Sequence, residues 1–181
     1  MPPDIFLKQP KLTNGKLHLF SLYMDFPAAA HARWLTSAIE KLAGQRRDIS
    51  CEMWKIDFLM ASENIRKMVN DEAANADVII IAASSFVQPE LRLIQWLQEL
   101  VTGKTDGTKP GLLIGLLGDE YTETSEIDWV VKAMIEYARQ TGRSFIWHRI
   151  GKHAMNDFEW LTKNIETLLD GKPEDGNQTI L

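Results

Sequence analysis

The chain has 181 residues, of which 45% are hydrophobic and 25% are charged, and its formal net charge is −5. This length suffices for one domain with a substantial core. The acidic balance disfavours a general nucleic-acid or anionic-membrane binder. The single cysteine, Cys51, excludes an intramolecular disulfide and a zinc site built on several cysteines. No stretch has the length of an apolar membrane span and no secretory signal is visible, so we expect a cytoplasmic protein.

Apolar runs and amphipathic helical patterns alternate along the chain. The sequence predicts strands over residues 17–23, 49–55, 76–85, 112–117 and 144–149. Helices are predicted to begin near residues 26, 62, 89, 125 and 156. Residues 1–15 are interpreted as an irregular lead-in, 16–171 as a single α/β domain and 172–181 as a polar tail.

The third predicted strand carries most of the fold assignment. Six consecutive apolar residues follow Asp77, and Ser84 and Ser85 close the run. Such a run is typical of a strand that is buried on both faces at the centre of a parallel sheet. Regular strand–helix alternation adds right-handed crossovers. We therefore predict a three-layer α/β/α sandwich with a five-stranded parallel sheet in the order 2-1-3-4-5, as in flavodoxin-like and receiver-like folds.

Particular residues are predicted to start and end the helices. Asp25 opens the first helix, Ser62 caps the second, and Ser125 begins a capping-box pattern in the fourth. Gly142 closes that fourth helix. Cys51 is expected to be a small buried side chain in the second strand.

The apolar faces of the helices predict which side chains enter the core. In the second helix this face includes Met68, and in the third it consists of Leu91, Ile94, Leu97 and Val101. Trp96 flanks the stripe of the third helix, and Trp129 flanks the apolar stripe of the fourth helix. Core packing is the default interpretation of both, and exposure at an interface is the alternative.

Ligands of such folds bind beyond the carboxyl ends of the strands. The candidate ligand-binding residues at that edge are Asp25, Ser84, Ser85, Phe86, Gly118 and Asp119. We expect Phe86 and Tyr121 to fill the cleft beside Ser84.

The loops at this edge argue against phosphate chemistry. The turn over residues 23–31 has no Gly, Ser or Thr to cradle a phosphate, and the charge of Asp25 repels one. A receiver takes its phosphoryl group on a carboxylate at the end of the third strand, where this chain has Ser84 and Ser85. Lys152 matches the receiver lysine only loosely, so we predict no aspartyl phosphorylation.

Other catalytic arrangements are also weak in the sequence. Asp25 and Asp119 are a candidate pair for a divalent cation, although acids at this edge more often cap helices, and we expect no metal site. Ser84 lies in no Gly-x-Ser-x-Gly elbow, and His31, the nearest candidate base, is interpreted as a surface residue.

Two short segments stand out beside the fold pattern: Met53-Trp54-Lys55-Ile56-Asp57 and Ala76-Asp77-Val78-Ile79-Ile80-Ile81-Ala82. Both resemble segments of a group of uncharacterised bacterial proteins of this length. The resemblance implies a single flavodoxin-like or receiver-like α/β domain in a bacterial cytosol, without a known activity. The segment over residues 89–100 also resembles a helix of flavin reductases of the flavodoxin superfamily.

These observations leave the function open between two main hypotheses. We expect a non-catalytic, receiver-like or flavodoxin-like domain that acts through protein contacts, with a protein partner or as a homodimer, and without a cofactor. The alternative is a protein or enzyme that binds FMN or a nucleotide at the cleft beside strands one, three and four. Mg²⁺-dependent phosphate chemistry on Asp25 and Asp119 is a third, weaker hypothesis.

Overall fold

The computed structural model describes residues 16–44, 48–85, 91–102, 111–119, 122–150, 161–163 and 165. Within these residues, five parallel strands form one sheet in the order β2-β1-β3-β4-β5, as predicted. The strands are β1 (Lys16–Tyr23), β2 (Asp48–Lys55), β3 (Val78–Ala83), β4 (Leu112–Leu117) and β5 (Ser144–His148). The helices are α1 (Phe26–Ala43), α2 (Ile56–Ala61), α3 (Glu63–Asn75), α4 (Leu91–Thr102) and α5 (Thr124–Thr141).

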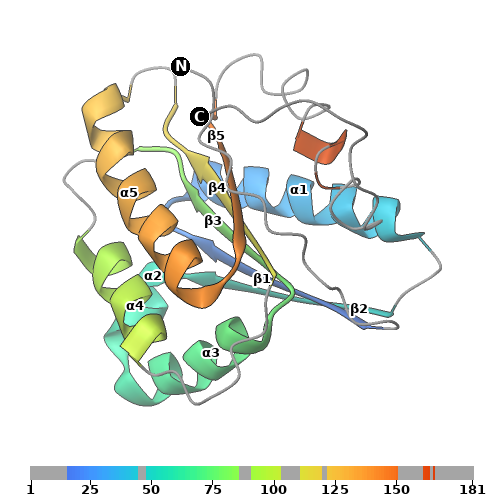
Figure 1. Cartoon of the computed structure of the whole chain (residues 1–181), viewed down its shortest axis with the longest axis horizontal. Helices are drawn as coiled ribbons and strands as arrows, with labels where there is room; N and C mark the ends of the chain where they lie inside the picture. The colour runs from blue at the N-terminus through green and yellow to red at the C-terminus, as the bar shows by residue number, and fades with distance from the viewer. Residues whose placement is uncertain are drawn as a thin grey trace.

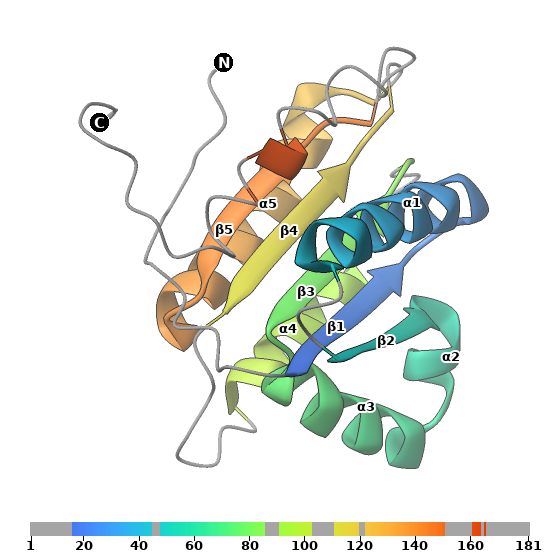
Figure 2. The same ribbon diagram turned by 90° about the vertical axis from the view of Figure 1, so that its right-hand side faces the viewer.

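Helices cover both faces of the sheet and make three layers. Figure 1 and Figure 2 show α1 on one face and α2, α3, α4 and α5 on the other. One core lies between the sheet and α1, together with Leu161 and Ile165, and the second lies beneath the other helices. All residues of β3 and β4 are buried because helices cover both of their faces. No helix among the described residues is long and apolar enough to cross a membrane.

The region after β2 differs from the prediction. The short helix α2 occupies residues that the sequence assigned to a loop, and Ser62 then caps α3 by accepting from the Ile65 N–H at 3.5 Å. Met68 was predicted to face the core and is exposed. Cys51 was predicted to be buried and is exposed, because β2 is an edge strand whose side chains are mostly only half-buried.

The predicted apolar face of α4 was rotated from the true one. Four side chains are buried, and they are Leu93, Trp96, Leu97 and Leu100. Leu91 is 69% exposed. Trp96 packs beneath the sheet with its ring stacked on Phe20 at 5.9 Å between centroids. The default interpretation of Trp96 as a core residue is therefore confirmed.

The start of α5 also corrects the sequence analysis, whereas its end confirms it. The helix begins at Thr124 after Glu123, which makes no side-chain capping bond, so the capping box predicted at Ser125 is wrong. Gly142 ends the helix in the left-handed conformation, with φ of 70°. The lead-in over 1–15, the tail over 172–181 and the start predicted for the last helix lie outside the described residues.

Candidate functional site

Backbone hydrogen bonds continue the sheet beyond the ends of its strands. The Met24 N–H donates to the Ala82 carbonyl at 2.9 Å, and the Gly118 N–H donates to the Ala83 carbonyl at 2.7 Å. The Ile150 N–H donates to the Gly118 carbonyl at 2.8 Å. These bonds place the segments after β1, β3, β4 and β5 side by side at the carboxyl edge.

The predicted site residues that can be placed all lie at this edge. They are Asp25, Ser84, Ser85, Gly118 and Asp119. Phe86 and Tyr121, which were predicted to fill the cleft, lie outside the described residues.

Asp25 is the centre of the hydrogen bonding at this edge. Its Oδ1 accepts from the Ala28 N–H at 2.9 Å, which makes Asp25 the N-cap of α1. The same oxygen accepts from the Ser84 hydroxyl at 2.5 Å. Its Oδ2 accepts from the N–H groups of Ser84 at 2.8 Å and of Ser85 at 3.3 Å. We call these four residues, Asp25, Ala28, Ser84 and Ser85, the Asp25 cluster.

The Asp25 cluster resembles an anion site that is filled from within the chain. Three backbone N–H groups and one hydroxyl converge on a single carboxylate. Donors of this kind, including those at the start of a helix, would hold a phosphate in a nucleotide-binding loop. Here the Asp25 carboxylate satisfies them and also ties the start of α1 to the end of β3. The cluster therefore supplies stability at the place where related folds bind ligands.

Gly118 allows the backbone to turn tightly after β4. Its φ is 71°, a conformation that residues with a Cβ rarely adopt. A Cβ at this position would also lie 2.5 Å from the Cδ1 of Ile127. Gly118 is thus required by packing against α5, and this explains its place at the edge without a ligand.

Asp119 belongs to a turn at the same edge. Its N–H donates to the Thr122 hydroxyl at 3.0 Å, and its Oδ1 lies 2.9 Å from that hydroxyl. The hydroxyl also lies 3.2 Å from the Ser84 carbonyl oxygen, so its single proton serves one acceptor at a time. Arg149 donates from Nε to the Asp119 carbonyl at 3.1 Å and from its guanidinium to the Thr122 carbonyl. The sequence analysis did not identify Thr122 or Arg149 as residues of this edge. The position of Arg149 directly after the last strand could have indicated that it lies there.

A second polar cluster lies where β2 ends. Asp57, in the first turn of α2, forms ion pairs with Lys55 at 2.7 Å and with Arg92 of α4 at 2.5 Å. The hydrogen bond from Lys55 is the largest of the causes that lower the pKa of Asp57, and the Arg92 guanidinium adds to it. All three side chains are substantially exposed, so these pairs position α2 against α4 and add little stability.

The described contacts favour neither the metal pair nor the Ser–His dyad. Ser84 donates to Asp25, and the Thr122 hydroxyl lies within hydrogen-bond distance of both the Ser84 carbonyl and Asp119, so Ser84 and Thr122 link the two acids. Neither acid belongs to a group of three converging metal-ligating side chains in the described residues. The Ser84 hydroxyl donates to Asp25, and His31 makes a 2.8 Å contact through Nδ1 with the Pro27 carbonyl of its own helix.

Comparisons with known proteins add little to this geometry. No protein-family model matches the chain. No curated protein matches it either. Among solved structures, the chain is similar to the crystal structure of Smu.1420 from Streptococcus mutans UA159, at 9% sequence identity and a TM-score of 0.48. The alignment covers 84% of this chain and 98% of that one. So distant a likeness carries no argument about function.

Proposed function

We propose that this chain is a non-catalytic α/β domain that acts through protein contacts, with a second copy of itself as the partner. The observation that carries the first part is the Asp25 cluster. Among the described residues, the Asp25 carboxylate satisfies the donors of Ala28, Ser84 and Ser85, which are of the kind that would hold a phosphate. Freeing these donors for a ligand would require breaking the cap of α1.

The surface between α4 and α5 supports contact with a second copy. A groove of about 270 Å³ lies between these helices, and we call it the α4–α5 groove. Its walls are mainly apolar, with amides and a carboxylate among them. The lining residues are Ile94, Leu97, Gln98, Val101, Thr102, Ala133, Glu136, Tyr137 and Gln140.

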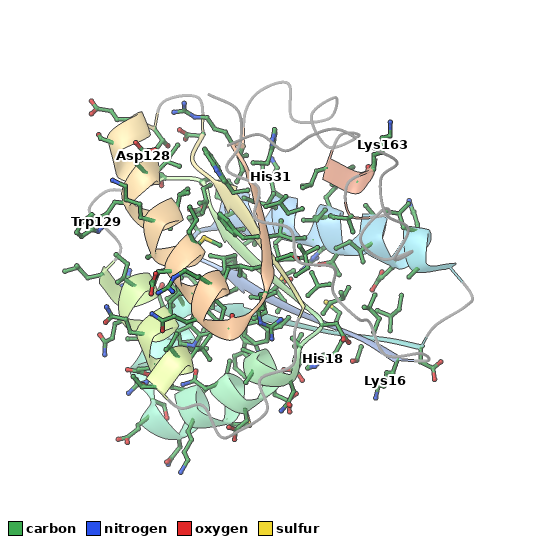
Figure 3. All side chains as sticks on the ribbon, viewed as in Figure 1. Lys16, His18, His31, Asp128, Trp129 and Lys163 are labelled. Carbon is green, nitrogen blue, oxygen red and sulfur yellow. The ribbon has the colours of Figure 1, made fainter. Side chains whose placement is uncertain are left out.

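An exposed aromatic side chain lies on the same face as the α4–α5 groove. Trp129 is 54% exposed and projects from the outer side of α5 (Figure 3). It precedes Ala133 by one helical turn, and Ala133 lines the groove. A projecting side chain beside a hollow is the arrangement that a two-fold symmetric contact needs, because each copy offers both parts.

The chemistry of the Trp129 side chain also matches that of the α4–α5 groove. An indole ring provides a large apolar surface and one N–H donor, and tryptophan is enriched among the residues that dominate interfaces. The apolar walls of the groove suit the ring, and Gln98, Glu136 and Gln140 supply acceptors for the N–H. We therefore infer that Trp129 of each copy enters the groove of the other.

Light scattering after size-exclusion chromatography tests this proposal. We expect a mass of twice the 20.6 kDa chain, and we expect Trp129→Ala to restore the single-chain mass. Phe26→Ala is the matched control: Phe26 is also an exposed aromatic residue, and it lies on α1 across the sheet. A wild-type monomer at every concentration, or a dimer that survives Trp129→Ala, would contradict the homodimer.

The alternative function is the binding of FMN or a nucleotide at the carboxyl edge. A yellow protein after purification, or a thermal shift with FMN, ATP or GTP, would support this alternative and contradict the non-catalytic contact domain. If none of these ligands changes the melting temperature, the interpretation of the Asp25 cluster as a structural element is supported.

A further inference from the structure

Three metal-ligating side chains come together in the half of the sheet opposite the carboxyl edge. They are His18 of β1, Glu52 of β2 and Glu72 of α3, which we call the His18 cluster. One ligand atom from each side chain lies within 4.8 Å of the other two, and the His18 Nε2 is 3.8 Å from a Glu72 carboxylate oxygen. Figure 3 shows His18 close to Lys16, the first residue of β1.

The fold dictates this convergence. Side chains alternate along a strand, so His18 and Phe20 point to the same face of β1. Phe20 pairs with Glu52 in the parallel register, which sets Glu52 diagonally across from His18 on that face. Helix α3 packs over this face through Val69 and Ala73, and Glu72 precedes Ala73. The three side chains come from three elements that the core holds in place.

Few described groups compensate the charge of the two carboxylates. Among the described residues, neither Glu52 nor Glu72 forms an ion pair with a lysine or arginine. Glu52 accepts one hydrogen bond, from the Trp54 indole at 3.3 Å, which orients its carboxylate. Two carboxylates held close together repel each other unless a cation lies between them. Outer hydrogen bonds of the Trp54 kind are common around metal ligands.

We propose that the His18 cluster binds a divalent transition-metal ion, with Zn²⁺ as the favoured ion. One imidazole nitrogen and two carboxylate oxygens are ligands that Zn²⁺ accepts, and three protein ligands leave its fourth position to water. Mg²⁺ prefers oxygen ligands alone, and Mn²⁺ binds such sites more weakly than Zn²⁺. The His18 cluster contains no sulfur ligand that would select a softer metal.

The distances allow the site to close around an ion. In tetrahedral coordination, ligand atoms about 2.0–2.2 Å from one Zn²⁺ lie about 3.3–3.6 Å from each other. The 3.8 Å separation is close to this range, and all three ligand atoms lie within 4.8 Å of one another, so the site has to contract only slightly around an ion. The Glu72 side chain is 46% exposed and can rotate to close this gap, whereas His18, at 17%, is held by packing.

Isothermal titration of the whole chain with ZnCl₂ tests the proposal. We expect one ion per chain with a dissociation constant of about 10 µM or tighter. We expect Glu72→Gln to weaken binding by about 100-fold or more, because even the loss of an outer partner of a metal ligand costs 10–100-fold. Glu72 lies on the exposed side of a helix, so this variant should fold, which circular dichroism will verify.

The controls separate this site from adventitious binding. His31→Gln removes a histidine of α1 outside the His18 cluster and should leave the Zn²⁺ affinity unchanged. Co²⁺ bound in place of Zn²⁺ should give visible absorption bands, and the Glu52→Gln variant should lose them. Failure of the wild type to bind Zn²⁺, or equal affinity in the wild-type and Glu72→Gln proteins, would overturn the proposal. So would loss of binding in His31→Gln.

Discussion

Replacing Asp25 with alanine removes every acceptor at the centre of the Asp25 cluster. The N–H groups of Ala28, Ser84 and Ser85 and the hydroxyl of Ser84 lose their shared partner. The start of α1 is then no longer joined by a side chain to the end of β3. We expect the free energy of unfolding to fall while the fold is retained.

The size of the loss follows from the exposure of each donor. Loss of an N-cap costs about 1 kcal/mol. Ser84 is only 6% exposed, so its unpaired N–H costs about 1–3 kcal/mol more. The hydroxyl of Ser84 can rotate to another acceptor and the N–H of Ser85 is exposed to water, so these two add little. We therefore expect Asp25→Ala to destabilise the protein by about 2–4 kcal/mol.

Urea unfolding followed by tryptophan fluorescence measures this loss, and two variants divide it into parts. Asparagine caps helices as well as aspartate does, so Asp25→Asn should keep the cap of α1 and lose only the bonds of its second oxygen, at about 1–2 kcal/mol. Ser62→Ala removes a cap alone, the one at the start of α3, and should cost about 0.5–1 kcal/mol. If Asp25→Ala costs no more than Ser62→Ala, the carboxylate does not join α1 to β3 and the interpretation of the edge fails.

The remaining predictions concern two glycines, Gly111 and Gly142, and the ion pair between Glu136 and Arg139. Gly111→Ala would place a Cβ 2.3 Å from the Asp77 carbonyl oxygen and 2.6 Å from an Arg143 nitrogen, so we expect a loss of about 2–3 kcal/mol in urea unfolding. Gly142→Ala, which meets only backbone strain at φ of 70°, should cost about 1 kcal/mol, and equal losses would contradict the clash. The pKa of Glu136 is lowered to about 2, and the hydrogen bond from Arg139 is the largest cause. NMR should therefore find the Glu136 carboxyl ionised at about pH 3.5, where an ordinary Glu is mostly protonated. Because the folded pKa is the lower one, the stabilising contribution of Glu136 is present above its unfolded pKa and is lost as the pH falls toward about 2. Arg139→Gln should raise the titration midpoint, and an unchanged midpoint would refute the assignment.

The strands and their order could be predicted because the sheet is covered on both faces. The apolar runs of β3 and β4 have no alternation, and such runs are typical of a central position in a parallel sheet. The buried face of a helix was harder to predict where the helix carries two apolar faces. On α4, Leu93 and Trp96 enter the core, while Ile94 and Val101 line the α4–α5 groove. Periodicity alone does not tell these two faces apart.

The sequence predicted which residues come together at the carboxyl edge, but not how they bond to one another. Topology brings Asp25, Ser84 and Asp119 to one edge, and the sequence was sufficient for that. Whether Asp25 faces a ligand or the donors of its own chain depends on side-chain geometry, which no pattern of residues encodes. The His18 cluster was missed for a related reason, since Glu72 reaches His18 only through the packing of α3 on the sheet.

Carboxylates in the two halves of the sheet differ in how many hydrogen-bond donors surround them. At the carboxyl edge the charge of Asp25 is matched by four donors from the chain. In the other half of the sheet, Glu52 and Glu72 share one indole and one imidazole among the described residues. Binding energy for a cation is available where acceptors are not already satisfied, so the metal-binding capacity lies away from the usual ligand edge. Measurements of both unfolding stability and Zn²⁺ affinity on Asp25→Asn and Glu72→Gln should therefore separate the two roles. The first variant loses stability and keeps its Zn²⁺ affinity, and the second keeps its stability without metal and loses that affinity.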